Sequence, residues 1–219
     1  MKNGDFAEIE YIGKIKQSGD IFDLTDENVA KENGLFNPKM SYGPITIIVG
    51  AKQILKGLDD ALLALNEGDK KTIDIEAKNA FGDRNTKLIR LTPMAHFKQQ
   101  KMEPKQGQYI TFEQGLRGKI LSVAGGRVKI DFNHPLAGKE LEYAVKVNKL
   151  VTDAAKKLES LIAFYFGNAT KNIKCAVTDD KAIITIDKKT PINDVVTKRI
   201  EEDVKKYITE IKTIEFKTA

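Results

Sequence analysis

The sequence predicts an α+β protein built from short strands and a few helices in more than one domain. One observation is a set of runs in which every second residue is apolar, as in Phe6–Ile15 and Leu141–Val147, which is typical of strands with one buried face. Another is that helical apolar spacing is confined to a few stretches, the longest of them near the C-terminal end. A third is a change of composition after Gly82, which indicates an inserted module.

The stretch from Tyr42 to Gly82 organises the rest of the chain. Alternating apolar residues from Ile45 to Val49 predict a short strand. An amphipathic helix is predicted from Gly57 to Glu67, with acids in its first turn that suit the helix dipole. A second strand, Lys71 to Ile75, then leads into the aromatic loop Ala80-Phe81-Gly82.

The segment before this stretch is predicted to form a strand, a turn and a strand. Phe6–Ile15 forms the first strand, Ser18-Gly19-Asp20 the turn, and Ile21-Phe22 the start of the second strand. Thr25 to Asn33 has a helix-like start in which Thr25 is the candidate N-cap. This short helix is interpreted as an insertion in a loop.

The residues after Gly82 predict a small α+β module. A strand over Leu88–Leu91 is followed by a short helix, Met94 to Lys101, which Thr92-Pro93 introduces. Three strands follow at Tyr109–Phe112, Leu116–Val123 and Arg127–Phe132, the last two joined by a Gly-Gly hairpin turn. The ends of such a module can lie close together, which is the geometry that permits insertion into a surface loop.

The chain from Thr152 onward predicts a separate αββαβ domain. Its first helix spans Ala154 to Phe166, and its strands span Ile173–Thr178, Ala182–Ile186 and Thr213–Phe216. Thr190-Pro191 provides a cap and a first-turn proline for the second helix. The apolar stripe of that helix consists of Ile192, Val196, Ile200, Val204, Tyr207, Ile208 and Ile211. No residue pattern in this domain indicates a chemistry, and the stripe is most simply core.

Four motifs, in chain order, together resemble the FKBP-type peptidyl-prolyl cis-trans isomerases. They are Tyr11-Ile12-Gly13 with Gly19-Asp20-Ile21-Phe22-Asp23, then Ile54-Leu55-Lys56-Gly57, then Ala80-Phe81-Gly82, then Asp131-Phe132-Asn133-His134-Pro135-Leu136-Ala137-Gly138-Lys139. The last is similar to the segment of the SlyD-like branch, which carries an inserted (insert-in-flap) domain, and the extra C-terminal domain resembles archaeal long FKBP-type isomerases. The resemblance implies an antiparallel β-sheet wrapped on a short helix. We therefore predict an isomerase domain over residues 1–84 and 129–152, an inserted chaperone-like domain over 85–128 and a C-terminal domain over 153–219.

The resemblance also implies an apolar proline pocket. Its catalytic positions carry over to Tyr11, Phe22, Asp23, Ile54, Leu55, Leu58, Phe81 and Tyr143, with Ile45 as a further substrate-binding position. In this scheme Phe22, Ile54, Leu58 and Tyr143 wall the proline ring, the backbone N–H of Leu55 holds a substrate carbonyl, and Asp23 beside Tyr11 forms the polar wall. Ordinary core packing is the alternative for each of these residues, above all for the aliphatic ones.

Two departures from the family pattern keep a second function open. The pocket floor of the family is often tryptophan, where this chain has Leu58, and its loop aromatic is often tyrosine, where this chain has Phe81. The leading prediction is an isomerase, with chaperone activity, that acts on X-Pro bonds of folding proteins. The alternative is an FKBP-fold chaperone or adaptor with little or no isomerase activity.

The inserted module supplies a candidate client-binding surface. Met94, Phe97 and Met102 cluster around its short helix, and a module of this size can bury little apolar surface. Exposed methionine and aromatic side chains suit adaptable binding of unfolded segments. The alternative is that they form the core of the module, and for Phe97 the two interpretations have equal weight.

Charge and composition disfavour nucleic-acid binding as the main function. The 219-residue chain carries a net charge of +5, but its lysines are scattered among nearly as many acids. Arginines, which suit phosphate and base recognition, are few. Gly115-Leu116-Arg117-Gly118 spells a GxxG, but predicted strands flank it, whereas KH domains place it between helices. A ribosome- or RNA-associated role remains the third hypothesis, and unfolded proline-containing chains are the expected partners.

No cofactor or metal site is expected. His96, His134 and Cys175 lie far apart in the sequence, and His134 is interpreted as a hinge where the chain re-enters the host domain. Cys175, the one cysteine, forbids an internal disulfide and fits a small core position. No segment approaches the length of a membrane span and Met1-Lys2-Asn3-Gly4 begins no signal peptide, so we expect a cytoplasmic protein without a membrane partner.

Overall fold

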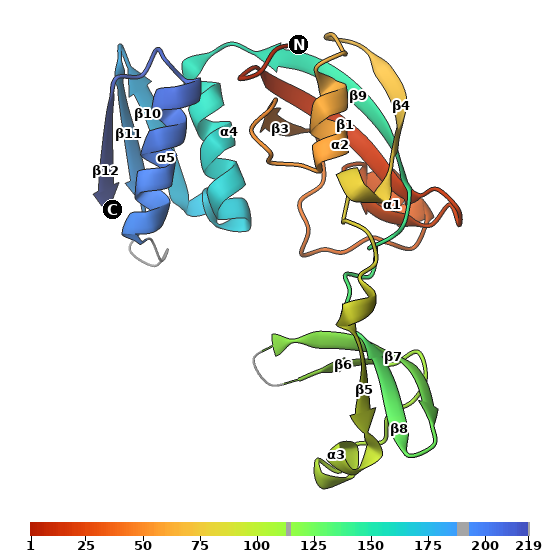
Figure 1. Cartoon of the computed structure of the whole chain (residues 1–219). Coiled ribbons are helices and arrows are strands. Elements are labelled where there is room, and N and C mark those ends of the chain that lie inside the picture. Colours follow the sequence, from red (N-terminus) through yellow and green to blue (C-terminus); the bar gives the residue numbers. More distant parts are fainter. Residues whose placement is uncertain (113–114, 188–192, 219) are drawn as a thin grey trace. The chain divides into compact units, whose positions relative to one another are not determined.

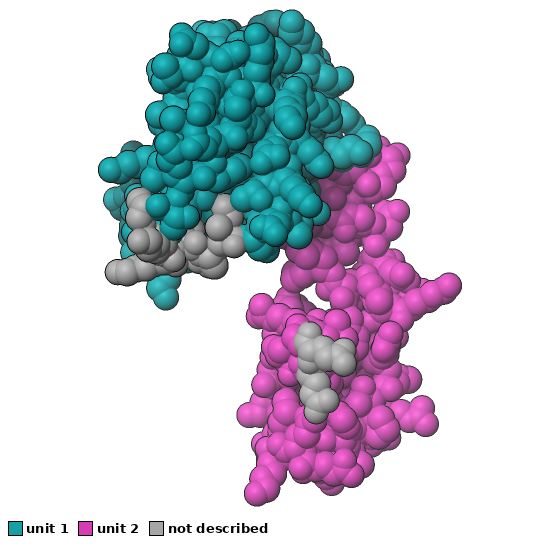
Figure 2. All heavy atoms as spheres, turned by 90° about the vertical axis from the view of Figure 1, so that its left-hand side faces the viewer, with its two compact units in different colours: residues 1–75, 141–219 teal, residues 76–140 magenta. Residues whose placement is uncertain are grey.

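The computed structural model describes residues 1–112, 115–187 and 193–218, which form two compact units. Figure 1 labels the elements along the chain. Residues 1–75 and 141–219 make the first unit, and residues 76–140 make the second (Figure 2).

The main sheet of the first unit has five strands in the order β2-β1-β9-β4, with β3 also paired to β1. Its strands are β1 (Phe6–Ile15), β2 (Ile21–Leu24), β3 (Ile45–Ile48), β4 (Lys70–Ile75) and β9 (Leu141–Val151). All pairs are antiparallel, and the longest ladder joins β1 to β9, from Phe6 opposite Val151 to Ile15 opposite Leu141. The chain that leaves the inserted module therefore completes the sheet begun by the N-terminal strand, as the alternation predicted.

Two helices accompany this sheet, α1 (Glu27–Glu32) and α2 (Lys56–Leu62). The prediction of Thr25 as the cap of α1 is wrong, because the Asp26 side chain accepts from the N–H groups of Asn28 and Val29. Thr25 is instead buried, and its Oγ1 accepts from the Tyr11 N–H at 2.9 Å. The helix α2 ends earlier than predicted, although it buries the predicted Leu58 and Leu62.

The C-terminal part of the first unit has the predicted αββαβ order. Its elements are α4 (Ala154–Phe166), β10 (Ile173–Thr178), β11 (Lys181–Ile186), α5 (Asp194–Tyr207) and β12 (Thr213–Thr218). The strands β10 and β11 pair antiparallel, whereas β11 and β12 pair parallel because α5 makes the crossover between them. The described cap of α5 is Asn193, whose Oδ1 accepts from the Val196 N–H at 2.9 Å. The predicted cap Thr190-Pro191, and Ile192 of the stripe, lie outside the described residues.

The C-terminal part of the chain shares a hydrophobic core with the sheet that precedes it. Phe6 of β1, Ile48 of β3 and Val151 of β9 belong to the same hydrophobic cluster as Leu158 and Ile162 of α4. Residues 153–219 therefore share a core with the sheet that precedes them, and they fall in one compact unit with it. Sequence periodicity could not reveal this, because it indicates which face of an element is buried but not against which partner.

The second unit contains a four-stranded antiparallel sheet in the order β5-β8-β7-β6. Its strands are β5 (Ile89–Pro93), β6 (Tyr109–Thr111), β7 (Arg117–Ala124) and β8 (Arg127–Asp131), and its α-helix is α3 (Met94–Gln99). Short 3₁₀ helices occur at Ala77–Asn79 and Thr86–Leu88 in this unit, and at Gly167–Asn172 in the first unit. The strand β8 pairs with β5 as far as Asp131, so the paired strands of the insert extend beyond the predicted boundary at residue 128.

The core of the second unit overturns the prediction of an exposed apolar cluster on α3. Phe97 has no solvent exposure and packs with Ile110, Ile120, Val128 and Ile130. Met94 and Met102 are half-buried against the same cluster. The helix α3 therefore covers the sheet and buries more apolar surface than the length of the module suggested. Phe97 belongs to the core of the module, and Met94 and Met102 lie at the margin of this core.

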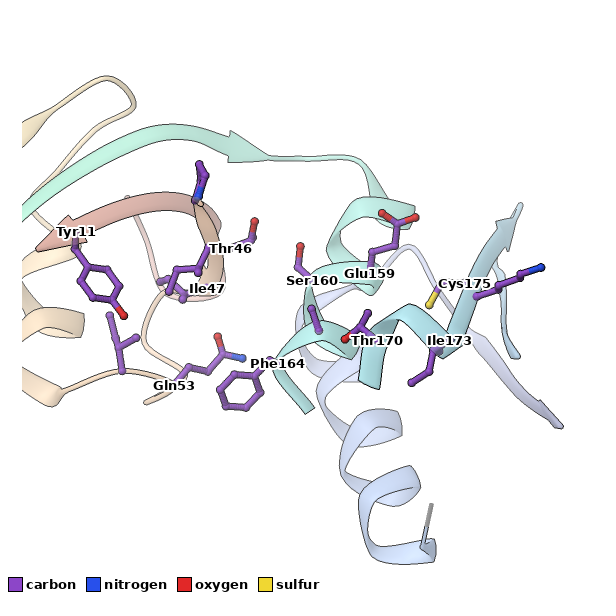
Figure 3. A pocket seen from close by; sticks show the side chains of 15 residues that line it. Tyr11, Thr46, Ile47, Gln53, Glu159, Ser160, Phe164, Thr170, Ile173 and Cys175 are labelled. Carbon is purple, nitrogen blue, oxygen red and sulfur yellow. The ribbon is translucent and has the colours of Figure 1, made fainter. Parts of the chain in front are cut away.

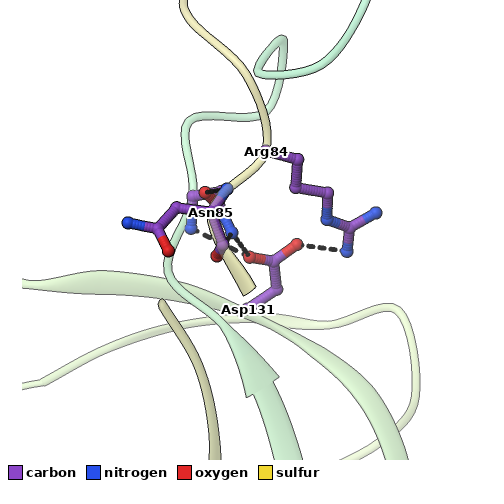
Figure 4. A network of polar contacts seen from close by, with 4 residues as sticks. Arg84, Asn85 and Asp131 are labelled. Carbon is purple, nitrogen blue, oxygen red and sulfur yellow. Dashed lines mark hydrogen bonds and ion pairs between the residues drawn. The ribbon is translucent and has the colours of Figure 1, made fainter. Parts of the chain in front are cut away.

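A polar network joins the two chain segments that enter and leave this sheet (Figure 4). Asp131 accepts hydrogen bonds from Arg84, from the Asn133 N–H at 2.9 Å and from Asn133 Nδ2 at 2.6 Å. Asn85 and Asn133 are bonded reciprocally, since the Asn85 N–H donates to Asn133 Oδ1 and Asn133 Nδ2 donates to the Asn85 carbonyl. The Asp131 side chain, 12% exposed, thus holds the two segments together at the base of the insert.

Candidate functional site

An aromatic cluster lies where β1, β2 and β9 meet in the first unit. The ring of Tyr143 on β9 packs at 5.6 Å from that of Tyr11 on β1. Phe22 on β2 meets the same ring edge-on, at 5.8 Å and 81°. Tyr143 is buried, while Tyr11 and Phe22 remain half-buried. The structure therefore brings together three of the aromatic residues predicted for the pocket.

Gly13 makes this packing possible. It lies opposite Tyr143 in the β1–β9 ladder and opposite Asp23 in the β1–β2 ladder. A Cβ atom at this position would lie 2.9 Å from Tyr143 Cζ and 3.1 Å from Phe22 Cζ. The glycine of the Tyr-x-Gly motif is thus required for the close approach of the two rings.

Asp23 provides the polar part of the cluster. The Tyr11 hydroxyl donates to Asp23 Oδ2 at 3.1 Å. Burial raises the pKa of Asp23, and the hydrogen bond from Tyr11 opposes part of this increase. Burial and, next, the charge of Asp23 raise the pKa of both Tyr11 and Tyr143 well above the usual range. Both phenols are therefore protonated at neutral pH, so that the site presents one hydrogen-bonded polar pair among apolar walls.

The loop before α2 is held by side chains that the sequence did not single out. The buried Asp59 carboxylate accepts from the Gly50 N–H at 2.7 Å and from the Lys52 N–H at 3.0 Å. Gln53 Oε1 accepts from the Ile48 N–H at 2.8 Å. The helix dipole alone therefore does not account for Asp59. The sequence did contain a signal for this anchoring role, namely an acid in the first helical turn after a loop that contains glycine. The N–H groups of such a loop need hydrogen-bond acceptors, and a nearby carboxylate can supply them.

This anchored loop presents Ile54 and Leu55. The Leu55 carbonyl accepts from the N–H groups of Leu58 and Asp59 at the start of α2. In the described part of the chain, nothing accepts a hydrogen bond from the Leu55 N–H. That donor is thus available for a further hydrogen bond, and its role in holding a substrate carbonyl stays a prediction. Leu58 is only 2% exposed, so it can serve only as a floor beneath the surface.

A groove of about 950 Å³ opens beside this loop, and Tyr11, Ile45 and Ile54 line it (Figure 3). Tyr11 thus belongs both to the aromatic cluster and to the groove. Of the predicted positions, Tyr11, Ile45 and Ile54 therefore line the groove, whereas Phe22, Asp23 and Tyr143 belong to the aromatic cluster with Tyr11.

Phe81 lies in the second unit, outside the part of the chain that builds this cluster. Its ring stacks on that of His134, with centroids 4.3 Å apart and an interplanar angle of 4°. His134 Nδ1 also accepts from the Leu136 N–H at 3.2 Å. The role of Phe81 as a pocket wall stays a prediction.

The described residues hold no group of three or more His, Cys, Asp or Glu side chains that could bind a metal ion. Cys175 is half-buried, and burial together with the charge of Glu159 raises the pKa of its thiol to about 11. The thiol is therefore protonated at neutral pH and unsuited to act as a nucleophile. Across the described ranges, no helix is both long and apolar enough to span a membrane.

Comparison with known proteins identifies relatives of this chain. A family model described as the FKBP26 IF domain matches residues 90–136. A short-type peptidyl-prolyl cis-trans isomerase of Methanocaldococcus jannaschii is 36% identical over 147 residues, which cover 67% of this chain and 92% of that protein. A probable FKBP-type 16 kDa peptidyl-prolyl cis-trans isomerase of Pseudomonas fluorescens is 36% identical over 108 residues, which cover 48% and 71%. The FKBP-type isomerase SlyD of Helicobacter pylori is 30% identical over 143 residues, which cover 64% and 70%.

The chain belongs to the FKBP-type peptidyl-prolyl cis-trans isomerases, a class of enzymes. The resemblance carried by the four motifs is thereby confirmed. The match to the IF domain also agrees with an insert that continues beyond residue 128.

Proposed function

We propose that this protein accelerates the cis–trans isomerisation of X-Pro bonds in folding polypeptides at the site formed by Tyr11, Phe22, Asp23, Ile54 and Tyr143. The observation that carries the proposal is the aromatic cluster packed over Gly13, with its single polar pair. The available N–H of Leu55, which follows Ile54 of the adjoining groove, supports it. These features form an apolar surface with one fixed donor and one fixed acceptor.

Such a surface suits the demand of the reaction. No bond is made or broken, and the barrier of about 18–20 kcal/mol arises from the loss of amide resonance as the C–N bond twists. The twisted amide is less dipolar than the planar one, so an apolar site that removes water favours the transition state over the ground state. The Leu55 N–H would hold the substrate carbonyl in place, and no proton transfer is required.

The test is an X-Pro isomerisation assay on a proline tetrapeptide with two matched variants. Phe22→Ala removes a ring that contacts Tyr143, whereas Phe36→Ala removes an exposed ring that stacks on Tyr42 in the loop after α1. We expect the wild type to accelerate isomerisation, Phe22→Ala to lose at least tenfold in kcat/KM, and Phe36→Ala to remain near the wild type. Equal activity of the two variants, with both folded, would place the pocket elsewhere.

We further propose that the insert binds unfolded segments of the same clients. Its apolar core is filled by Phe97 and its neighbours, but Leu91 and Leu116 remain 60% and 49% exposed, and Tyr109 is 40% exposed. Exposed apolar side chains of this kind suit weak binding of varied chains. A client held there would be at an effective concentration of order millimolar for the prolyl site of the same molecule.

Replacement of residues 88–132 by a short loop tests this proposal. We expect tetrapeptide isomerisation to stay within about an order of magnitude, while proline-limited refolding of a protein falls much further, because only the long client gains from capture. Equal losses on both substrates would show that the insert supports the pocket and does not capture clients.

The second candidate function, a chaperone or adaptor with little catalysis, rests on Leu58 and Phe81. Leucine gives a smaller floor than the tryptophan frequent in the family, and phenylalanine lacks the hydroxyl of tyrosine. Suppressed aggregation of an unfolded protein without tetrapeptide isomerisation would support this candidate over the first.

A further inference from the structure

The groove that touches the prolyl site has its second wall in the C-terminal part of the chain. Tyr11, Ile45 and Ile54 line one side, and Ala163 and Phe164 of α4 line the other. Figure 3 shows both walls, with Gln53 on the side of the host sheet and Ser160 and Phe164 on α4. Ile173 and Cys175 of β10 also line the groove. A surface that begins at predicted pocket residues thus continues onto a part of the chain with no assigned role.

The two walls are fixed to each other. Phe6 and Ile48 from the host sheet share a core with Leu158 and Ile162 on the inner face of α4. The helix also follows β9 almost directly, since β9 ends at Val151 and the side chain of Asp153 caps α4 by accepting from the Lys156 N–H. The groove is therefore a preformed feature of the first unit, and no ordering of the chain is needed to create it.

Phe164 stands out among the lining residues. The inner face of α4 buries Leu158, Leu161 and Ile162 almost completely, yet Phe164 is 49% exposed at the groove. A large apolar ring left in water beside a preformed groove is a usual feature of a binding surface. Glu159 and Lys174 add one charge of each sign to the lining, so neither charge sign dominates there.

We propose that this groove is an extended subsite for the polypeptide chain that flanks the isomerising proline, with Phe164 as a specificity-determining contact for a bulky apolar side chain of the substrate. The proposal rests on the isomerase function proposed above. Continuity with Tyr11, Ile45 and Ile54 identifies the occupant as the substrate chain, because a chain seated at the proline pocket must leave it along some surface. A volume of about 950 Å³ is at the upper end of the usual range for small-molecule pockets and exceeds the need of one proline ring.

The expected effect is on binding and not on the chemical step. Phe164 is not among the residues placed around the twisting amide, so it would stabilise ground state and transition state equally. Its removal should therefore raise KM and leave kcat unchanged. Short substrates that do not reach α4 should be insensitive to it.

The experiment compares two peptides that share one X-Pro bond, a tetrapeptide and a decapeptide with leucines on both flanks. For Phe164→Ala we expect the KM of the decapeptide to rise about three- to tenfold, with kcat unchanged and the tetrapeptide within twofold of the wild type. Val195→Ala is the matched control, because Val195 is an exposed apolar residue of α5 outside the groove lining. An equal loss on both peptides, or no change on either, would overturn the proposal.

A binding measurement separates this proposal from the catalytic one. The chain contains no tryptophan, so Phe164→Trp introduces a single fluorescent reporter at the groove. We expect a saturable emission shift with the decapeptide and none with the tetrapeptide. A wild type without tetrapeptide activity would refute the isomerase function alone, whereas the absence of an emission shift with the decapeptide would refute the extended subsite.

Discussion

Two carboxylates of this protein, Asp23 and Asp131, behave in opposite ways. Asp23 accepts hydrogen bonds only from neutral donors, the Tyr11 hydroxyl and the Leu24 N–H, and burial outweighs them and raises its pKa. Burial acts in the same direction on Asp131, but hydrogen bonds from Asn133 and the charge and hydrogen bond of Arg84 outweigh it and lower its pKa. Asp131 thus sits in a site that favours its charge, while Asp23 is kept in one that disfavours it. This contrast separates a carboxylate that we propose acts in the prolyl site from one that stabilises the structure.

The largest expected difference is in catalysis. Asp23→Ala should lower kcat/KM on a proline tetrapeptide roughly tenfold or more, because loss of a positioned polar contact costs about 1–3 kcal/mol. The fold should persist, because the substitution removes a buried carboxylate whose charge destabilises the folded protein. Asp131 lies in the second unit, so Asp131→Ala should leave kcat/KM on the tetrapeptide within about twofold of the wild-type value. Tetrapeptide kinetics and circular dichroism on both variants provide the measurement, and a larger loss for Asp131→Ala would reverse the comparison.

The next effect is on the local stability of the insert. Asp131→Ala leaves the Asn133 N–H without its acceptor, removes one of the two acceptors of Asn133 Nδ2 and frees Arg84, so opening of the insert should become easier by about 1–3 kcal/mol. Hydrogen exchange at β8 amides, including Val128 and Ile130, would report it. The control is Asp83→Ala, an exposed acid in the same connecting segment. Unchanged exchange in Asp131→Ala would show that the network is not what holds the segments together.

These networks also show what the sequence could and could not predict. Alternating apolar residues located β1, β9 and β10 well, because that signal is local. Tyr11, Phe22 and Asp23 were grouped through the resemblance of their motifs to the FKBP-type isomerases. The anchoring role of Asp59 was not predicted, since an acid in a first helical turn fits the helix dipole as well as it fits loop anchoring.

The packing that the sequence did not predict is of a different kind. Phe6 and Leu158 share a core although they are remote in the sequence, and no local pattern pairs them. For Phe97, helical spacing could not tell whether its apolar face meets the sheet of the insert or solvent. The groove wall formed by Phe164 follows from that same long-range packing, and so it could not be predicted either.

A third effect is the sign of the pH dependence of stability. The raised pKa of folded Asp23 means that its favourable contribution is present below the unfolded value of 3.8 and is lost as the pH rises through the folded value. The lowered pKa of Asp131 means that its contribution is present above 3.8 and is lost as the pH falls through the folded value.

Asp23→Asn should therefore gain stability relative to the wild type between acid and neutral pH, while Asp131→Asn should lose it over the same interval. Denaturant unfolding of the three proteins at a series of pH values measures both trends. Two difference curves with the same sign would mean that the environment of one carboxylate has been misassigned.

The smallest expected effect concerns the tyrosines that face Asp23. Burial is the first cause of the raised pKa of Tyr11 and Tyr143, and the charge of Asp23 comes next. Asp23→Asn should therefore move both titrations toward lower pH without returning them to the ordinary tyrosine value, because the rings stay buried. NMR of ring-labelled tyrosines after a rapid jump to alkaline pH can follow them before unfolding. Tyr165 is the internal reference, since its pKa of about 12 depends on burial and Asp203. A shift of Tyr165 as large as that of Tyr11 would indicate a general loosening of the protein and would remove Asp23 as the cause.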